Sequence, residues 1–488
     1  MRFACRYRNL DYQEKQVMKK QLKYILITLA AAAVVGLGAL LAVLFIPDAP
    51  ADTSSVPVSQ KVVIYQKNAS DVVKMTVTNQ HGSYDVLPKP SGNFYIDGLE
   101  DYTVVQSYIT TLVNSYSSLN AKRLIAENPE DMSIYGFEEP IATAVMEFKD
   151  ETKTVIIGAG EPTTNGYYCK LADSNAVYLL TSGIGGRLLS DKLYFIDTTI
   201  TTGYDTNEEL AFDKVVLSGT VRDKEIVIVP TPDNEDDTYA EIFGYQIISP
   251  ANAPLDLTTG NDFLTSFFVL SADSAVVLSP DEATLAEYGF DKPYSVATIE
   301  SSAGDFTVTV GKKDGEYCYV MNDTKDVIFK CPASSIPWLE SQYQDLVSSI
   351  FLVPHINLVG KVDITTPDNE YNFTVSHDET TNTIFAKHGD RYVNTENFQS
   401  LYQVLVSCYL ENYTTERSDA EPYLTIQYTF HEGGVERLEL YTSPSDSRQA
   451  LIKYNDNWTD FSVRMVYVDK IIEDCQRLLR GESITTTW

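Results

Sequence analysis

The chain lacks the short motifs that accompany the common catalytic sites. It has no Gly-x-Ser-x-Gly nucleophile elbow, no His-Glu-x-x-His zinc motif, no Cys-x-x-Cys pair and no Gly-x-x-x-x-Gly-Lys phosphate loop. Histidine is also scarce, and its five residues are scattered: His81, His355, His377, His388 and His431. A metal centre or a general base needs such residues in a cluster. The sequence therefore predicts no catalytic residue, no metal ligand and no cofactor site, and we expect a protein that is not an enzyme.

Cysteine is too scarce and too irregularly placed for a disulfide scaffold. Of the six cysteines, Cys5 precedes a long apolar run, and an odd set of five follows it: Cys169, Cys318, Cys331, Cys408 and Cys475. A repeat alignment places Cys169 and Cys318 at equivalent positions, and Cys408 and Cys475 fall among helix core positions. We interpret all five as small buried hydrophobic residues. The alternative is a bond between Cys318 and Cys331 across one predicted meander.

Positive charge is low as well, with 37 Lys and Arg against 68 Asp and Glu and a formal net charge of −31. Such an acidic chain is not expected to bind nucleic acid or an anionic lipid surface. The acidic run Asp233–Asp237 raises the alternative of a calcium site, since calcium takes clustered oxygen ligands. The run does not follow the spacing of a calcium loop, so we interpret it as a hydrated hairpin tip.

One long apolar run is present near the N-terminus. Residues 24–46, from Tyr24 to Ile46, carry no charge, and a helix of that length spans a hydrocarbon core of about 30 Å. Seven basic and two acidic residues precede the run. By the positive-inside rule, we expect a single-pass cell-membrane protein with residues 1–23 in the cytoplasm and the remainder outside. Residues 47–60 are rich in Pro, Ser, Thr and Ala and predict a solvated stalk.

Two alternatives concern this N-terminal region. Ala49-Pro50-Ala51 resembles the cleavage site of a signal peptide, but the apolar run exceeds the ~7–15 residues usual for one, so we favour an uncleaved anchor. Met18-Lys19-Lys20 would give a compact charged segment before the run, which makes Met18 an alternative start with the same topology.

An internal repeat dominates the remainder. Tyr135-Gly136-Phe137-Glu138-Glu139-Pro140 recurs 153 positions later as Tyr288-Gly289-Phe290-Asp291-Lys292-Pro293. A strand ending at Gly158 has its counterpart at Gly311, with the same offset. A segment with Tyr167 and Cys169 then matches one with Cys318 at an offset of 149, which implies that a loop has been shortened. A third copy follows without this signature.

Each copy predicts a strand, a hairpin, an amphipathic helix, and a meander that closes on another helix. The opening strands are Val72–Val77, Lys214–Leu217 and Val359–Ile364, and the third meander runs through Leu424–Tyr428, Leu438–Tyr441 and Ala450–Tyr454. The predicted helix core comprises Val104, Val105, Tyr108, Ile109, Leu112, Val113 and Tyr116; then Phe263, Leu264, Phe267 and Phe268; then Phe398, Leu401, Tyr402, Leu405 and Tyr409; and finally Val468, Ile471, Ile472, Cys475, Leu478 and Leu479.

The spacing favours an α+β fold of three tandem, mostly antiparallel units with covering helices. A chain of 488 residues has room for about three domains of ~150 residues, which agrees with the repeats. We place repeat domain 1 at 61–205, repeat domain 2 at 206–355 and a divergent repeat domain 3 at 356–488. Both Gly136 and Gly289 are expected to hold a positive φ in a turn.

The signature, followed by a strand that ends in glycine, by Gly166-Tyr167-Tyr168-Cys169 and by Leu189-Ser190-Asp191-Lys192, resembles the bacterial domain-of-unknown-function family forty-three-forty. This chain has Phe where family members commonly have Leu. The resemblance implies an N-terminally anchored protein that is often encoded beside gliding-motility-type ABC transporters. It therefore implies an accessory role in export or envelope assembly, and it supplies no catalytic residue.

Two functions from different classes remain. The first is an extracytoplasmic binding or scaffold protein whose partner is an ABC transporter permease or another envelope protein. The second is an envelope carbohydrate-binding protein or hydrolase with a site between the repeats, where some of the 32 tyrosines could stack on sugars. A polar pocket shared by two repeats favours the second function. A flat apolar patch favours the first.

Overall fold

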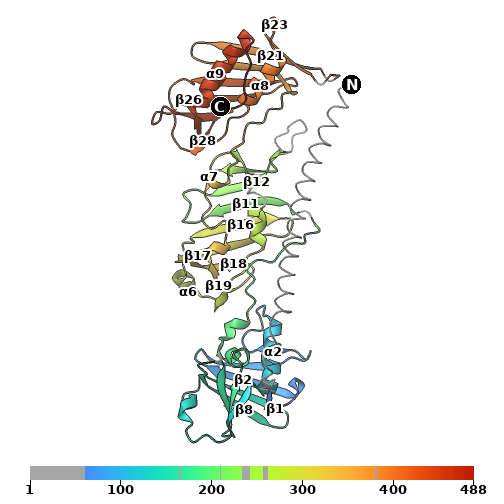
Figure 1. The fold of residues 1–488 in the computed structure, drawn as a ribbon, viewed down its shortest axis with the longest axis vertical. Coiled ribbons are helices and arrows are strands. Elements are labelled where there is room, and N and C mark those ends of the chain that lie inside the picture. The colour runs from blue at the N-terminus through green and yellow to red at the C-terminus, as the bar shows by residue number, and fades with distance from the viewer. Residues whose placement is uncertain are drawn as a thin grey trace, which may run out of the picture.

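The computed structural model describes residues 61–163, 166–208, 210–232, 242–256, 262–378, 380–381 and 383–488. These residues form three large antiparallel sheets, which follow one another in chain order along the long axis (Figure 1). A small sheet pairs β1 (Val62–Gln66) with β5 (Ser118–Ala121). Antiparallel strands with a few covering helices confirm the α+β prediction. The predicted tail, transmembrane helix and stalk, and the acidic run Asp233–Asp237, lie outside the described residues.

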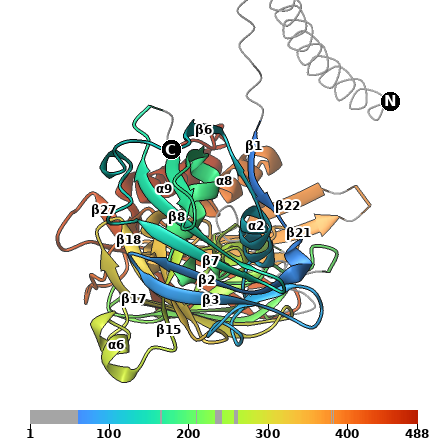
Figure 2. The ribbon, with the colours of Figure 1, turned by 90° about the horizontal axis from the view of Figure 1, so that it is seen from below.

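Sheet 1 has eight strands in the order β4-β3-β2-β7-β8-β9-β10-β6. The strands are β2 (Val72–Asn79), β3 (Gly82–Pro88), β4 (Phe94–Ile96), β6 (Arg123–Ala126), β7 (Ala142–Phe148), β8 (Thr152–Gly160), β9 (Tyr167–Leu171) and β10 (Val177–Leu180). Helix α2 (Gln106–Ser117) covers one face (Figure 2). The short helices α3 (Ser182–Gly185), η3 (Gly186–Leu189) and η4 (Lys192–Phe195) follow the last strand.

Sheet 2 has nine strands in the order β14-β13-β12-β11-β16-β17-β18-β19-β15. They are β11 (Phe212–Ser218), β12 (Ile226–Pro230), β13 (Tyr245–Ser249), β14 (Ala253–Pro254), β15 (Ser274–Leu278), β16 (Ser295–Ser301), β17 (Phe306–Asp314), β18 (Tyr317–Asn322) and β19 (Val327–Pro332). Its helices are short: η5 (Ser266–Phe268), α6 (Glu282–Glu287) and α7 (Tyr343–Leu346).

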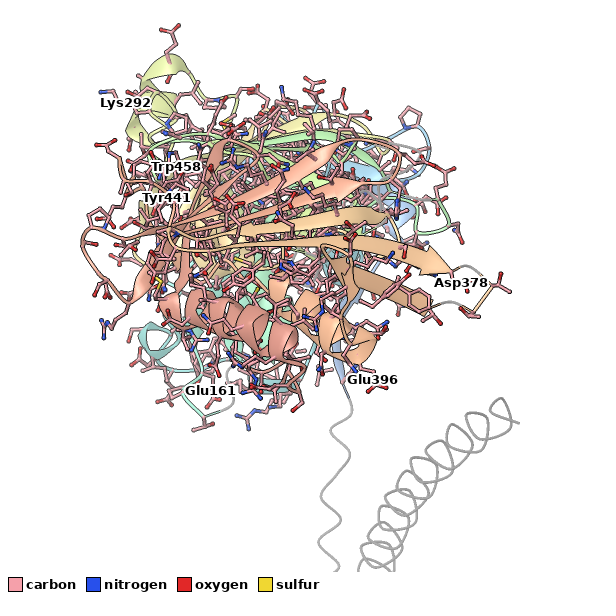
Figure 3. The ribbon with its side chains drawn as sticks, turned by 90° about the horizontal axis from the view of Figure 1, so that it is seen from above. Glu161, Lys292, Asp378, Glu396, Tyr441 and Trp458 are labelled. Carbon is pink, nitrogen blue, oxygen red and sulfur yellow. The ribbon has the colours of Figure 1, made fainter. Side chains whose placement is uncertain are left out.

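Sheet 3 has nine strands in the order β23-β22-β21-β20-β25-β26-β27-β28-β24. They are β20 (Val359–Thr365), β21 (Glu370–Asp378), β22 (Thr383–His388), β23 (Arg391–Tyr392), β24 (Asn412–Tyr413), β25 (Leu424–Phe430), β26 (Val435–Thr442), β27 (Gln449–Tyr454) and β28 (Asn457–Arg464). Helices α8 (Thr395–Leu405) and α9 (Met465–Arg480) lie together on one face (Figure 3).

The three large sheets share one strand order. In each sheet the first strand lies in the middle, the next strands lie in order on one side, and the last four lie in order on the other. The strand that precedes those four crosses to the far edge, as β6, β15 and β24 do. Sheet 1 differs from the other two only in having one strand fewer on its first side.

Most predicted core positions are buried, and the exceptions have local causes. Tyr108 is 44% exposed, because it lies on the solvent side of α2, where it stacks on Tyr194 with the ring centroids 5.1 Å apart. Tyr409 is 39% exposed, because α8 ends at Leu405 and Tyr409 forms a bridge with Ile350 instead. Leu479 is 42% exposed in the last turn of α9. Ile472 is only partly buried, and Val104 and Val105 precede α2.

Strand pairing corrects part of the repeat alignment. On sheet 1, Ile157 pairs with Cys169, and Val310, which lies 153 positions after Ile157, pairs with Val320 on sheet 2. The structural counterpart of Cys169 is therefore Val320 and not Cys318. The error is two residues, which keeps the same face of the strand, so the prediction that both cysteines are buried holds. Both strands also continue beyond Gly158 and Gly311 instead of ending there.

Main-chain pairing joins sheet 1 to sheet 2. Ile200 N donates to the carbonyl of Leu270 at 2.8 Å, and Ala272 N donates to the carbonyl of Thr198 at 2.8 Å. The side-chain amide of Asn322 on β18 adds a bond to the carbonyl of Ile200 at 3.0 Å. The main-chain hydrogen bonds are donated from both sides of the junction, and a buried side chain adds a third. The two sheets therefore meet in a defined register.

Sheet 2 and sheet 3 meet through a second set of contacts. Leu410 N donates to the carbonyl of Ser349 at 2.9 Å, and the hydroxyl of Tyr402 on α8 donates to the carbonyl of Pro354 at 2.8 Å. The ring of Phe351 packs edge-on against Tyr454 of β27, with the centroids 5.4 Å apart. The connection between sheets 2 and 3 is therefore packed into the third core instead of being free.

Candidate functional site

The repeated signature forms a packed turn on sheets 1 and 2. Gly136 has φ +72° and Gly289 has φ +82°, which confirms the predicted positive φ at both. A Cβ atom placed on Gly158 would lie 2.1 Å from the carbonyl oxygen of Tyr135, and one on Gly311 would lie 2.3 Å from that of Tyr288. The signature turn thus rests directly on the glycine of the neighbouring strand, and no side chain fits between them.

Aromatic side chains close each signature turn in the same way. Tyr135 packs edge-on against Tyr168 at 5.0 Å, and Tyr288 packs edge-on against Tyr319 at 4.7 Å. The Lys312 ammonium lies 5.2 Å from the centre of the Tyr288 ring. Through these contacts the signature turn packs against the face of the sheet. The signature therefore has a role in folding.

Histidines and acidic residues do not gather into a metal centre in the described part of the chain. No group of three or more His, Cys, Asp or Glu side chains there is placed to hold a metal ion. His81 lies in the β2–β3 hairpin, and His431 lies in the β25–β26 turn. His377 instead lies within β21, opposite Ile384.

A charged and aromatic cluster lies on sheet 3, on the face away from α8 and α9 (Figure 3). Tyr441 and Trp458 meet there with their ring centroids 4.9 Å apart. The carboxylate of Glu439 is nearly buried, and it accepts ion pairs from Arg437 at 2.8 Å and Lys453 at 3.3 Å. Because its charges are already paired with one another, this cluster has little left to offer a ligand.

The junction of sheets 1 and 2 holds a cleft of about 370 Å³. One wall is the β2–β3 hairpin, the second is the start of η4, and the third is the edge strand β15 of sheet 2. The lining residues are Asn79, His81, Gly82, Ser83, Tyr84, Asp191, Lys192, Leu193, Val276, Val277 and Leu278. Polar groups thus come from sheet 1, and an apolar strip comes from sheet 2, the mixture typical of ligand sites.

Tyr84 carries the unsatisfied polar group of this cleft. The residue is 7% exposed, and its hydroxyl is buried without a hydrogen-bond partner among the described residues. Burial raises the pKa of the phenol, and the nearby Asp191 carboxylate raises it further. The hydroxyl is therefore neutral at physiological pH. An unpartnered buried hydroxyl destabilises the fold by about 1–3 kcal/mol.

Asp191 and Lys192 place one negative and one positive charge beside Tyr84. Asp191 caps η4 by accepting a hydrogen bond from Leu193 N at 3.0 Å, which occupies one of its two carboxylate oxygens. No described residue forms an ion pair with Asp191 or Lys192. The cleft can therefore offer a carboxylate oxygen and an ammonium group to a polar ligand without breaking an existing ion pair.

Sequence reasoning missed this cleft. Asp191 and Lys192 were singled out only as part of a family-like stretch, and Tyr84 was one tyrosine among many. No sequence pattern links β3, η4 and β15, because they lie 79 or more residues apart and meet only through the pairing of the two sheets. A polar stretch directly after the final strand of the first copy was the one available signal.

A comparison with protein-family models gives one result. The model described as Domain of unknown function (DUF4340) matches residues 95–217 and again residues 246–425. The chain belongs to this family. Each matched segment contains one copy of the signature. No curated protein matches the chain.

The DUF4340 matches run across the sheets. The first begins at the end of β4 and continues into β11, the opening strand of sheet 2. The second begins in β13 and ends in β25 of sheet 3. The first segment contains the sheet 1 side of the first junction, with Thr198 and Ile200, and the second contains its sheet 2 side, with Leu270 and Ala272. The cleft falls partly inside the first segment, through Asp191 and Lys192, and partly inside the second, through Val276–Leu278.

Proposed function

We propose that the protein is a membrane-anchored extracytoplasmic binding protein, accessory to an ABC-type transporter or to envelope assembly. The observation that carries this proposal is the cleft between sheets 1 and 2, which is lined by Tyr84, with a buried hydroxyl that has no partner among the described residues, and by the charged side chains of Asp191 and Lys192. A buried polar group without a hydrogen-bond partner destabilises the folded protein, and a bound partner that supplied the missing hydrogen bond would remove that destabilisation. Lys192 and Asp191 then give the partner an orientation.

The shared strand order supports this function. We propose that the three large sheets are three tandem repeats of one unit, with seams near Thr206 and His355, the third having lost the signature. Copying one unit enlarges a recognition surface and creates junctions between copies. It does not by itself assemble a nucleophile, a base and an oxyanion site. In this arrangement the cleft is a product of the duplication, because neither unit contains it alone.

The anchor is proposed from the sequence. Residues 24–46 would cross the membrane, with the short basic tail in the cytoplasm and residues 47–488 outside. Among the described residues, no helix is long and apolar enough to cross a bilayer. Protease added to intact protoplasts should remove the outer region, whereas survival of the full-length band would contradict this topology.

The transporter partner is proposed from the family resemblance alone. Affinity purification of the tagged, detergent-solubilised full chain, followed by mass spectrometry, should recover a permease or another envelope protein. The matched control is a Lys192→Ala/Asp191→Asn double variant, which keeps the hydrogen-bond acceptor that caps η4 and removes both cleft charges. Equal recovery of the partner by the wild type and this variant would show that the partner does not bind through the charges of the cleft.

A second candidate function is an envelope carbohydrate-binding protein or hydrolase acting in the same cleft. It is favoured by the position of the cleft between two sheets and by His81 and Asp191 in its lining. Incubation with cell-wall fragments should then release products, and Asp191→Asn should abolish the release. Asp291→Asn, on the signature turn, is the control. Loss of activity in Asp191→Asn alone would replace the accessory-protein proposal with an enzyme.

A further inference from the structure

Cys318 and Cys331 lie directly opposite one another on neighbouring strands of sheet 2. They are register partners between β18 and β19, so their side chains emerge on the same face of the sheet. Both are fully buried. The Cys318 thiol donates a hydrogen bond to the carbonyl oxygen of Cys331 at 3.5 Å.

The local register has the spacing that a disulfide requires. Ala333 N donates to the carbonyl of Glu316 at 2.8 Å. Because antiparallel pairs alternate between bonded and non-bonded types, the Cys318–Cys331 pair is also of the hydrogen-bonded type. Pro332, which has no N–H, accordingly falls opposite Tyr317 in a non-bonded pair. Bonded pairs separate their Cα atoms by about 5.5 Å, inside the ~4.4–6.8 Å range of disulfides.

The other described cysteines lack such a partner. Cys169 pairs with Ile157 on one side and Tyr178 on the other. Cys408 lies beside Tyr467, and Cys475 is buried within α9. Any oxidation within the described part of the folded chain is therefore directed to one pair of thiols.

We propose that Cys318 and Cys331 are an oxidation site that forms a reversible cross-strand disulfide. The oxidant is a disulfide, either a small molecule or a dithiol oxidoreductase in its disulfide form. The Cys331 thiolate attacks one sulfur of that disulfide and releases the first thiolate, which leaves a mixed disulfide on Cys331. The Cys318 thiolate then attacks Cys331 and releases the second. The chain loses two protons and two electrons, and the oxidant becomes two thiols.

The two thiols differ in a way that fits this order of attack. The interaction with the Cys318 thiol lowers the pKa of Cys331, whereas the interaction with Cys331, together with burial, raises the pKa of Cys318. Cys331 is thus the better first nucleophile, since the thiolate is the reacting form. Because both sulfurs are buried, the reaction must wait for local opening of the sheet.

Oxidation at this pair would reach the junction between sheets 1 and 2. The Cys331 thiol lies 3.6 Å from the carbonyl oxygen of Ser271, and Ser271 forms the β-bridge to Thr199 of the preceding unit. Forming the disulfide removes that thiol hydrogen and ties β18 to β19. The next strand beyond β19 is β15, which forms one wall of the cleft. The cysteine pair is therefore linked to the cleft through β15, which pairs with β19.

The test uses the full chain in detergent, incubated with oxidised glutathione under native conditions and then alkylated in denaturant. Of the six cysteines, four should be alkylated after complete reaction, and peptide mapping should show a link between residues 318 and 331. The intact mass should fall by two hydrogen atoms, and dithiothreitol should restore it. Cys318→Ala should leave five alkylated cysteines or a glutathione adduct on Cys331, without an internal link.

Three results would overturn the proposal. One is six alkylated cysteines in the native wild type under conditions in which the urea-unfolded chain is oxidised. Another is a link that joins any other pair of cysteines. The third is a link between two chains at Cys318 or Cys331. The decisive measurement is made on the wild type, so the test remains valid even if Cys318→Ala does not fold.

Discussion

The carbonyl oxygen of Tyr135 lies only 2.1 Å from the position of a Cβ atom on Gly158. These two residues are the ends of the conserved spacing in the repeat, and the second copy repeats the contact between Tyr288 and Gly311 at 2.3 Å. The turn can therefore pack against the strand only because the strand has a glycine, without a side chain, at the point of contact. This contact explains physically why both landmarks recur at one offset, without any catalytic role.

Replacing Gly158 by alanine should destabilise sheet 1 by about 1–3 kcal/mol, because the added methyl overlaps a main-chain oxygen that cannot rotate away. Gly160→Ala on the same strand is the control, since its Cβ would approach no described atom closer than 3.9 Å. Hydrogen exchange of sheet 1 peptides measures the local free energy in a chain that need not unfold in one step. Equal protection in the two variants would show that the turn moves away freely.

Replacing Gly136 by valine should also destabilise sheet 1, by about 1 kcal/mol or more, because a β-branched residue at φ +72° is strained. The new Cβ would lie 2.9 Å from Ala159 N. Gly183→Val, in open space without a positive φ, is the control. Unchanged exchange in Gly136→Val would contradict the account of the signature as a packed turn.

Tyr84→Phe should leave the stability of the unliganded protein unchanged or raise it by up to ~1 kcal/mol, because it removes a buried hydroxyl without a partner. Tyr116→Phe is the matched control: its buried hydroxyl donates to the carbonyl of Ile184 at 2.9 Å, so its loss should cost about 1 kcal/mol. Both are read from hydrogen exchange of sheet 1. A clear loss in Tyr84→Phe would mean that the hydroxyl is already satisfied.

Asp281 should contribute to acid sensitivity near the second signature turn. It caps α6 by accepting a hydrogen bond from Thr284 N at 2.8 Å, and hydrogen bonds from Thr284 hold its pKa below the usual value. A carboxylate with a lowered folded pKa stabilises the fold above its unfolded pKa and loses that contribution as the pH falls through the folded value, below about pH 4. Asp281→Asn keeps the acceptor but does not titrate. Its α6 amides should therefore lose less protection between pH 7 and pH 3 than those of the wild type, and an equal loss would contradict this.

Local patterns predicted the fold where one strand or helix determines the outcome. The opening strands at Val72, Lys214 and Val359 and the third meander follow from β-branched and alternating residues. Helix faces were predicted less well at their ends. Tyr108 and Tyr409 have suitable spacing, but their exposure depends on where the helix begins or stops and on what packs beside it.

The candidate site could not be predicted, because its parts are brought together by pairing between distant strands. Tyr84 on β3 packs against Phe195 of η4, with the ring centroids 6.0 Å apart. The third wall, Val276–Leu278, reaches them only because Ile200 pairs with Leu270. The repeat alignment matched Cys169 with Cys318 instead of Val320 for a related reason. The spacing of residues in the sequence reflects the length of the loop between two strands, whereas the pairing of the strands sets their register.

The central claim is that the protein acts by binding a partner in the cleft between sheets 1 and 2. A photo-crosslinking amino acid in place of Val277, in the cleft wall, tests it in the full-length protein in intact membranes. The same substitution at Val296, on the opposite side of β16 from the core residue Ala297, is the control. The account predicts a single cross-linked envelope protein from position 277, weakened by Lys192→Ala, and none from position 296. Identical adducts at both positions, or none at 277 while the partner still co-purifies, would contradict it.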